Sequence, residues 1–84
     1  KKRQQHHAEA LSLLQQALPT YQRVYGSVHQ RVADTLYQIG DTAAEMGDRD
    51  LAQRHLQEAV AQRRELLGES HPKTRRATNR LRTL

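Results

Sequence analysis

The motif Gly26-Ser27-Val28-His29 recurs as Gly68-Glu69-Ser70-His71, 42 residues further along the chain. The same shift keeps other pairs in register, among them Ala10 with Ala52, Leu14 with Leu56, Gln15 with Gln57 and Ala17 with Ala59. A period of about 20 to 50 residues is typical of solenoids, in which each unit buries its apolar face only against the next unit. The sequence therefore predicts a repeat architecture.

Between the two copies of the motif, apolar residues are spaced by three or four, which is typical of helices. The first stripe comprises Val28, Val32, Leu36, Ile39, Ala43 and Met46. Gly47 should end this helix and Asp48 should cap the next one. The second stripe comprises Leu51, Ala52, His55, Leu56, Ala59, Val60, Leu66 and Leu67, and Gly68 is its expected stop. The spacing predicts a helical hairpin over residues 28–67.

Two further helices are expected on either side of this hairpin. Residues 5–25, after a basic tail at 1–4, are expected to form the second helix of a preceding unit, with an inward stripe of Ala10, Leu14, Ala17, Leu18, Tyr21 and Val24. Pro19 removes a backbone hydrogen bond there, which predicts a kink near residues 15–19 or two shorter helices. Pro72 favours a first turn, and residues 71–84 form the first helix of a following unit, either a cap or a truncation.

The expected fold is thus all-α, a single α-solenoid of antiparallel helix hairpins with about four helices. It resembles the tetratricopeptide repeat family at Leu36, Ile39, Gly40, Ala43, Gly47, Ala52, Leu56 and Ala59. The 42-residue spacing and the segments 29–36 and 67–72 resemble the longer repeats of kinesin light chains. Those repeats usually carry two Asn on the first helix, where this chain has Tyr37 and Gln38, so cargo rules of that group are not transferred.

The resemblance implies a protein-protein interaction scaffold that binds a peptide or partner helix in a concave groove lined by the first helices. The residues expected to project into it are Asp34, Tyr37, Gln38, Asp41, Glu45, Arg76, Asn79 and Arg80. An acidic patch would then adjoin a basic one and suit a mixed-charge ligand, with Tyr37 as an amphipathic anchor. The alternative is an ordinary solvated helix face, since exposed helix surfaces are charged in any case.

Composition narrows the class of protein. A chain of 84 residues with 36% hydrophobic residues and neither Phe nor Trp has a marginal core, so further repeats or domains are expected in the parent chain. The chain lacks Cys, which excludes disulfides and thiolate metal sites and favours a cytoplasmic location. No stretch approaches the roughly 20 apolar residues of a membrane span.

The net charge of +5 supports a second hypothesis, nucleic-acid or acidic-surface binding through the Arg-rich C-terminal helix. The basic excess is confined to the two ends, because residues 4–69 carry six Arg against nine Asp and Glu. A stripe that follows phosphates would interleave cations with aromatic residues along one face. Self-association through Leu81, Leu84 and the uncovered helix faces is a third hypothesis.

No enzyme, metal site or cofactor is expected. His29 and His71 stand at equivalent places before helices, which favours helix capping and packing over partner contact. The pairs His6–Glu9 and His55–Glu58 each offer only two ligands one turn apart. The chain also lacks glycine-rich phosphate loops, and none of its Ser residues follows a strand in a nucleophile elbow.

Overall fold

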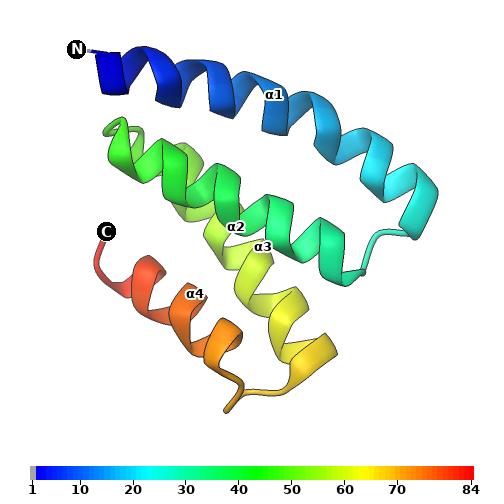
Figure 1. Cartoon of the computed structure of the whole chain (residues 1–84). Helices are drawn as coiled ribbons and strands as arrows, with labels where there is room; N and C mark the ends of the chain where they lie inside the picture. Colours follow the sequence, from blue (N-terminus) through cyan, green and yellow to red (C-terminus); the bar gives the residue numbers. More distant parts are fainter. Residues whose placement is uncertain (1) are drawn as a thin grey trace.

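The computed structural model describes residues 2–84, with side chains from residue 6 onward. Within that range the chain forms four helices and no strand. They are α1 (Lys2–Tyr25), α2 (Gln30–Glu45), α3 (Arg49–Leu67) and α4 (Pro72–Arg82). Successive helices run antiparallel, and each packs on the next (Figure 1). The predicted all-α helical repeat is confirmed.

The two copies of the opening motif have the same local structure. Gly26 and Gly68 adopt φ angles of +96° and +92°, in the left-handed region that favours glycine. The imidazole of His29 accepts a hydrogen bond from the amide of Arg31 at 3.0 Å, and that of His71 accepts one from Lys73 at 3.1 Å. The predicted capping role of both histidines is confirmed, so the sequence repeat is also a repeat of helix termination and initiation.

The turn inside the hairpin also follows from its sequence. Gly47 has a φ of +85°, and Asp48 accepts a hydrogen bond from the amide of Leu51 at 3.3 Å. The predicted N-cap at Asp48 is therefore confirmed, as is Pro72 in the first turn of α4.

Helix α1 corrects two expectations. It runs unbroken through Pro19, so the alternative of two shorter helices is wrong (Figure 1). Pro19 cannot donate to the carbonyl of Gln15, but both residues are exposed, so water can solvate that carbonyl. Helix α1 also begins at Lys2, so residues 2–4 are helical rather than a separate tail; Lys1 lies outside the described residues.

The core lies between α2 and α3 and extends to α4. Its largest fully buried side chains are Leu36, Ile39, Leu56, Val32 and, on α4, Thr74. A Cβ atom at Gly40 would lie 2.6 Å from Cγ of Leu56, so only glycine permits this close crossing of the two helices.

Helix α1 contributes less to the core than its apolar stripe predicted. Leu18 and Tyr21 pack against the cluster of Val32, Leu36 and Ala59. Val24, however, is 66% exposed, and Val28 and Met46 are also exposed. These three residues stand close to helix ends, where no neighbouring helix covers them, so their predicted inward position was wrong.

Candidate protein-binding face

The predicted groove residues lie on α2 and α4, and one ion-pair cluster joins these two helices. Nε of Arg80 on α4 donates to Oδ1 of Asp41 on α2 at 2.7 Å. Its Nη2 lies 3.9 Å from Oε2 of Glu45, whose other oxygen lies 3.1 Å from Nε2 of His7 on α1. Asp41, Glu45 and Arg80 are all partly exposed, so this cluster forms part of the surface.

A second cluster lies nearer the start of α2 and is built around a buried arginine. Arg63 of α3 has only 5% of its surface exposed. Its Nη2 donates to Oδ1 of Asp34 at 3.1 Å, and its Nη1 donates to the backbone carbonyl of Lys73 at 2.8 Å. Its guanidinium also lies 4.5 Å from the ring centre of Tyr37. One cation thus connects α2, α3 and α4 through two charge-assisted hydrogen bonds and a cation–π contact.

Sequence reasoning missed Arg63. Its position continues the buried stripe of Ala52, Leu56 and Ala59 by one helical turn, and this spacing was the available signal. A charged residue at a core position of a helix indicates a partner on a neighbouring helix, because an unpaired buried charge is strongly disfavoured.

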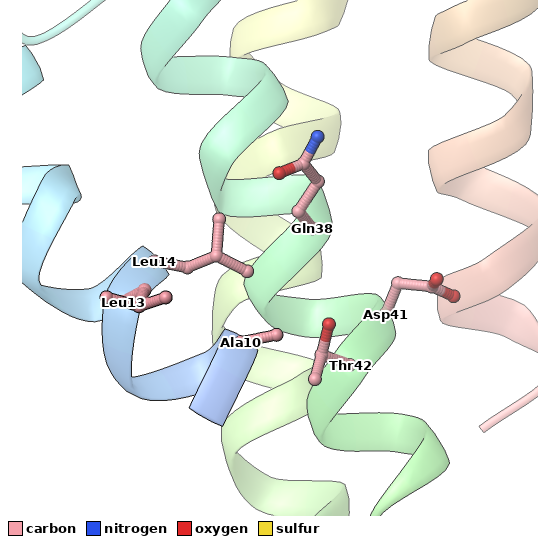
Figure 2. A pocket seen from close by; sticks show the side chains of 6 residues that line it. All are labelled: Ala10, Leu13, Leu14, Gln38, Asp41 and Thr42. Atoms are coloured by element: carbon pink, nitrogen blue, oxygen red, sulfur yellow. The ribbon is translucent and has the colours of Figure 1, made fainter. Parts of the chain in front are cut away.

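The other predicted groove residues do not share one hollow. Gln38 is exposed and lines a hollow of about 370 Å³ between α1 and α2 (Figure 2). Asn79 is exposed and lines a different hollow of about 290 Å³, together with Glu69, Arg75, Thr78 and Arg82. Arg76 is also exposed on α4.

These positions change the expected charge pattern. The acidic and basic residues were expected to form adjoining patches, but Asp41 and Arg80 are paired with each other, as Figure 2 illustrates by the orientation of the Asp41 side chain toward α4. Pairing lowers the net field that each residue presents to a ligand. Both aspartates, Asp34 and Asp41, use Oδ1 in their pairs.

The histidines contribute to helix structure. Nδ1 of His55 lies 3.1 Å from the carbonyl oxygen of Leu51, one turn earlier in α3.

Among the side chains that the structure describes, no three His, Asp or Glu residues gather closely enough to hold a metal ion. None of the described helices combines the length and apolar composition needed to cross a membrane.

Stacked antiparallel hairpins with a 42-residue repeat, small residues at the crossings and polar first helices define a helical-repeat scaffold. The tetratricopeptide repeat family model matches residues 1–65 and again residues 31–81. The chain therefore belongs to the tetratricopeptide repeat family, as its motifs predicted, and members of this family generally mediate protein-protein interactions without catalysis. Comparison with curated proteins gave no match, and comparison with solved structures gave none either.

Proposed function

We propose that this chain is a non-catalytic scaffold that binds a protein segment across the polar faces of α2 and α4. The observation that carries the proposal is the Arg80–Asp41 pair at 2.7 Å, which bridges the first helices of two successive units. A ligand lying across both helices would contact the exposed polar side chains that flank this pair.

The available polar atoms favour a particular ligand chemistry. Oδ2 of Asp34 and Oδ2 of Asp41 would accept hydrogen bonds from a Lys or Arg side chain or from backbone amides. Arg76 and Asn79 on α4 are exposed donors for a carboxylate or a backbone carbonyl. The ligand that fits is therefore an extended or helical segment of mixed charge, basic near α2 and acidic near α4.

The finer family assignment is also a proposal. The 42-residue period and the segment 67–72 support a repeat of the long, kinesin light chain-like type. Tyr37 lies against Arg63 at one of the positions where those repeats usually carry Asn, so its ring is part of the scaffold as well as a ligand contact. We also propose a cytoplasmic location and further repeats in the parent protein.

Nucleic-acid binding is the second candidate, because Arg75 and Arg82 line the same hollow of α4. Two observations weigh against it. Glu69 lines that hollow too, and Arg80 is already paired with Asp41 and Glu45. A carboxylate beside the arginines repels phosphate.

The test is a selection of binders from a displayed library of random 12-residue peptides, followed by titration of the selected peptides against the full chain. Tyr37→Ala and Asn79→Ala should each weaken binding by about tenfold, because anchor contacts of this kind contribute 1 kcal/mol or more. Glu58→Gln, on the exposed outer side of α3, is the matched control and should leave affinity unchanged.

Failure of the library to yield a binder sensitive to Tyr37 or Asn79 would refute the proposed site. Binding of a 20-nucleotide single-stranded DNA that weakens steeply with salt, and weakens in an Arg75→Gln, Arg82→Gln variant, would support nucleic-acid binding instead.

A further inference from the structure

Arg63 of α3 contacts both helices of the candidate binding face from their buried side. Its Nη2 donates to Oδ1 of Asp34 on α2 at 3.1 Å, and its guanidinium lies 4.5 Å from the ring centre of Tyr37 on the same helix. Its Nη1 donates to the carbonyl of Lys73, in the first turn of α4, at 2.8 Å. One side chain therefore fixes parts of α2 and of α4 relative to each other.

The Arg63 side chain lies beneath the face and is closed to a ligand. Only 5% of the surface of this residue is exposed. The Asp34 side chain, in contrast, is 38% exposed, and Tyr37 is half-buried. Arg63 can thus affect a ligand only through the residues that it contacts.

Helix packing does not require a cation at this position. A shift of 42 residues carries Arg63 onto Tyr21 of α1, a neutral residue that packs against the core. The same shift carries Asp34 onto Arg76 of α4. Neither flanking unit can therefore form the same ion pair, and the pair is specific to the central hairpin.

The buried charge also contributes little that an apolar side chain could not. Nε of Arg63 is buried without a hydrogen-bond partner in the part of the chain that the structure describes. A buried ion pair is often no more stabilising than well-packed apolar residues of similar volume. What distinguishes Arg63 from an apolar residue is its effect on Asp34, Tyr37 and the start of α4.

We propose that Arg63 is a positioning residue of the binding face, which holds Asp34, Tyr37 and the first turn of α4 in the arrangement that a ligand binds. This role rests on the proposed function and adds to it the residue that fixes the geometry of the site. Side chains that are already ordered lose little entropy when a ligand binds, so their positioning raises affinity.

The charge of Arg63 and its positioning effect act on a ligand in opposite directions. The ligand segment proposed to lie near α2 is basic, so a cation beside Asp34 lowers the electrostatic attraction. Loss of the charge alone would strengthen binding, whereas loss of positioning would weaken it. Positioning has the larger effect, because a ligand would otherwise have to order both Asp34 and Tyr37.

The first experiment is NMR spectroscopy of the ligand-free chain. Three-bond couplings report the χ1 angles of Asp34 and Tyr37, which should each occupy one rotamer in the original chain. Arg63→Met retains a long apolar side chain at the buried position, and its couplings should shift to rotamer-averaged values. Arg64→Met is the matched control. It removes the same charge from the neighbouring, half-exposed position of α3 and should leave both couplings unchanged.

The second experiment titrates the peptides selected from the 12-residue library into the same variants, at a temperature where circular dichroism shows them folded. Arg63→Met should bind about tenfold more weakly, through faster dissociation. Arg63→Lys should show a similar loss, because its ammonium group keeps the charge but lacks the planar fork that contacts Asp34 and the Lys73 carbonyl together. Arg64→Met should bind as the original chain does.

Three results would overturn the positioning role. They are unchanged couplings in Arg63→Met, equal or tighter peptide binding by Arg63→Met, and full binding by Arg63→Lys, which would assign the effect to charge. If Arg63→Met does not fold, the couplings and affinity of Arg63→Lys decide. Absence of any peptide that binds the original chain would refute the binding face itself, whereas peptide binding that is insensitive to Arg63 would refute only its positioning role.

Discussion

Arg63 of α3 donates a hydrogen bond from Nη2 to Oδ1 of Asp34 on α2, across a distance of 3.1 Å. The arginine is buried, whereas the Asp34 side chain is 38% exposed. The pair therefore links the core of the hairpin to its candidate binding face. A ligand that binds the Asp34 carboxylate therefore contacts a group whose position depends on Arg63, a buried cation of the neighbouring helix.

Arg63→Ala should lower the free energy of unfolding by about 2 kcal/mol, because it removes charge-assisted hydrogen bonds to Asp34 and to the Lys73 carbonyl. Urea denaturation followed by circular dichroism measures the change. Arg64→Ala is the neighbouring control. Arg64 is half-exposed and pairs with exposed Glu69, so its removal should cost less than about 1 kcal/mol. Equal effects of the two substitutions would contradict the assigned role of Arg63.

Gly40→Ala should destabilise the hairpin by about 1–3 kcal/mol, although alanine is the better helix former. The reason is the 2.6 Å approach of the added Cβ to Leu56. Thermal unfolding and urea denaturation measure whether the free energy of unfolding falls or rises. Leu56→Ala should relieve the clash, so the double variant should be more stable than the sum of the two single effects predicts. Strictly additive changes in the free energy of unfolding would show that the added Cβ at residue 40 does not clash with Leu56.

His71→Ala should destabilise α4 by about 0.5–2 kcal/mol through loss of its N-cap, whereas His71→Asn should retain stability. The hydrogen bond that matters runs from the amide of Lys73 to Nδ1 of His71. Hydrogen exchange of the Lys73 amide provides a local measurement, and it should accelerate in the alanine variant only. His29→Ala should have the same effect at Arg31, because the repeat places the same cap there. An unchanged exchange rate in both alanine variants would refute the capping role.

Pro19→Ala should raise the free energy of unfolding by about 1 kcal/mol or more, since proline is disfavoured by about 3 kcal/mol in a helix interior. The new amide can donate to the carbonyl of Gln15, and Pro19 is exposed, so little packing is lost. Helical ellipticity and urea midpoints measure the gain. A loss of stability would mean that proline at this position is needed for α1 to pack on α2.

Helix boundaries and capping could be predicted closely, because they depend on residues a few positions apart. The glycines with positive φ, the caps at His29, Asp48 and His71, and the proline that opens α4 all act within one turn. Pro19 is the exception, since its local penalty predicted a kink or two shorter helices, whereas α1 runs unbroken through it.

The candidate binding face was less predictable. The 42-residue repeat predicted which residues lie on the faces of α2 and α4. It places Asp34, Gln38 and Asp41 on one helix and Arg76 and Arg80 on the equivalent one. The repeat could not show that Asp41 binds Arg80, or that Gln38 and Asn79 line separate hollows.

The sequence by itself thus determined the helical-repeat class, the order of the helices and their ends, since these depend on local propensity and on the periodic placement of apolar residues. Only the tertiary structure decided which charges meet and which partners the buried Arg63 contacts. These features depend on the crossing of helices, which brings together residues as far apart in the sequence as Arg63 and Asp34 or Arg80 and Asp41, and a pattern of neighbouring residues does not specify such contacts.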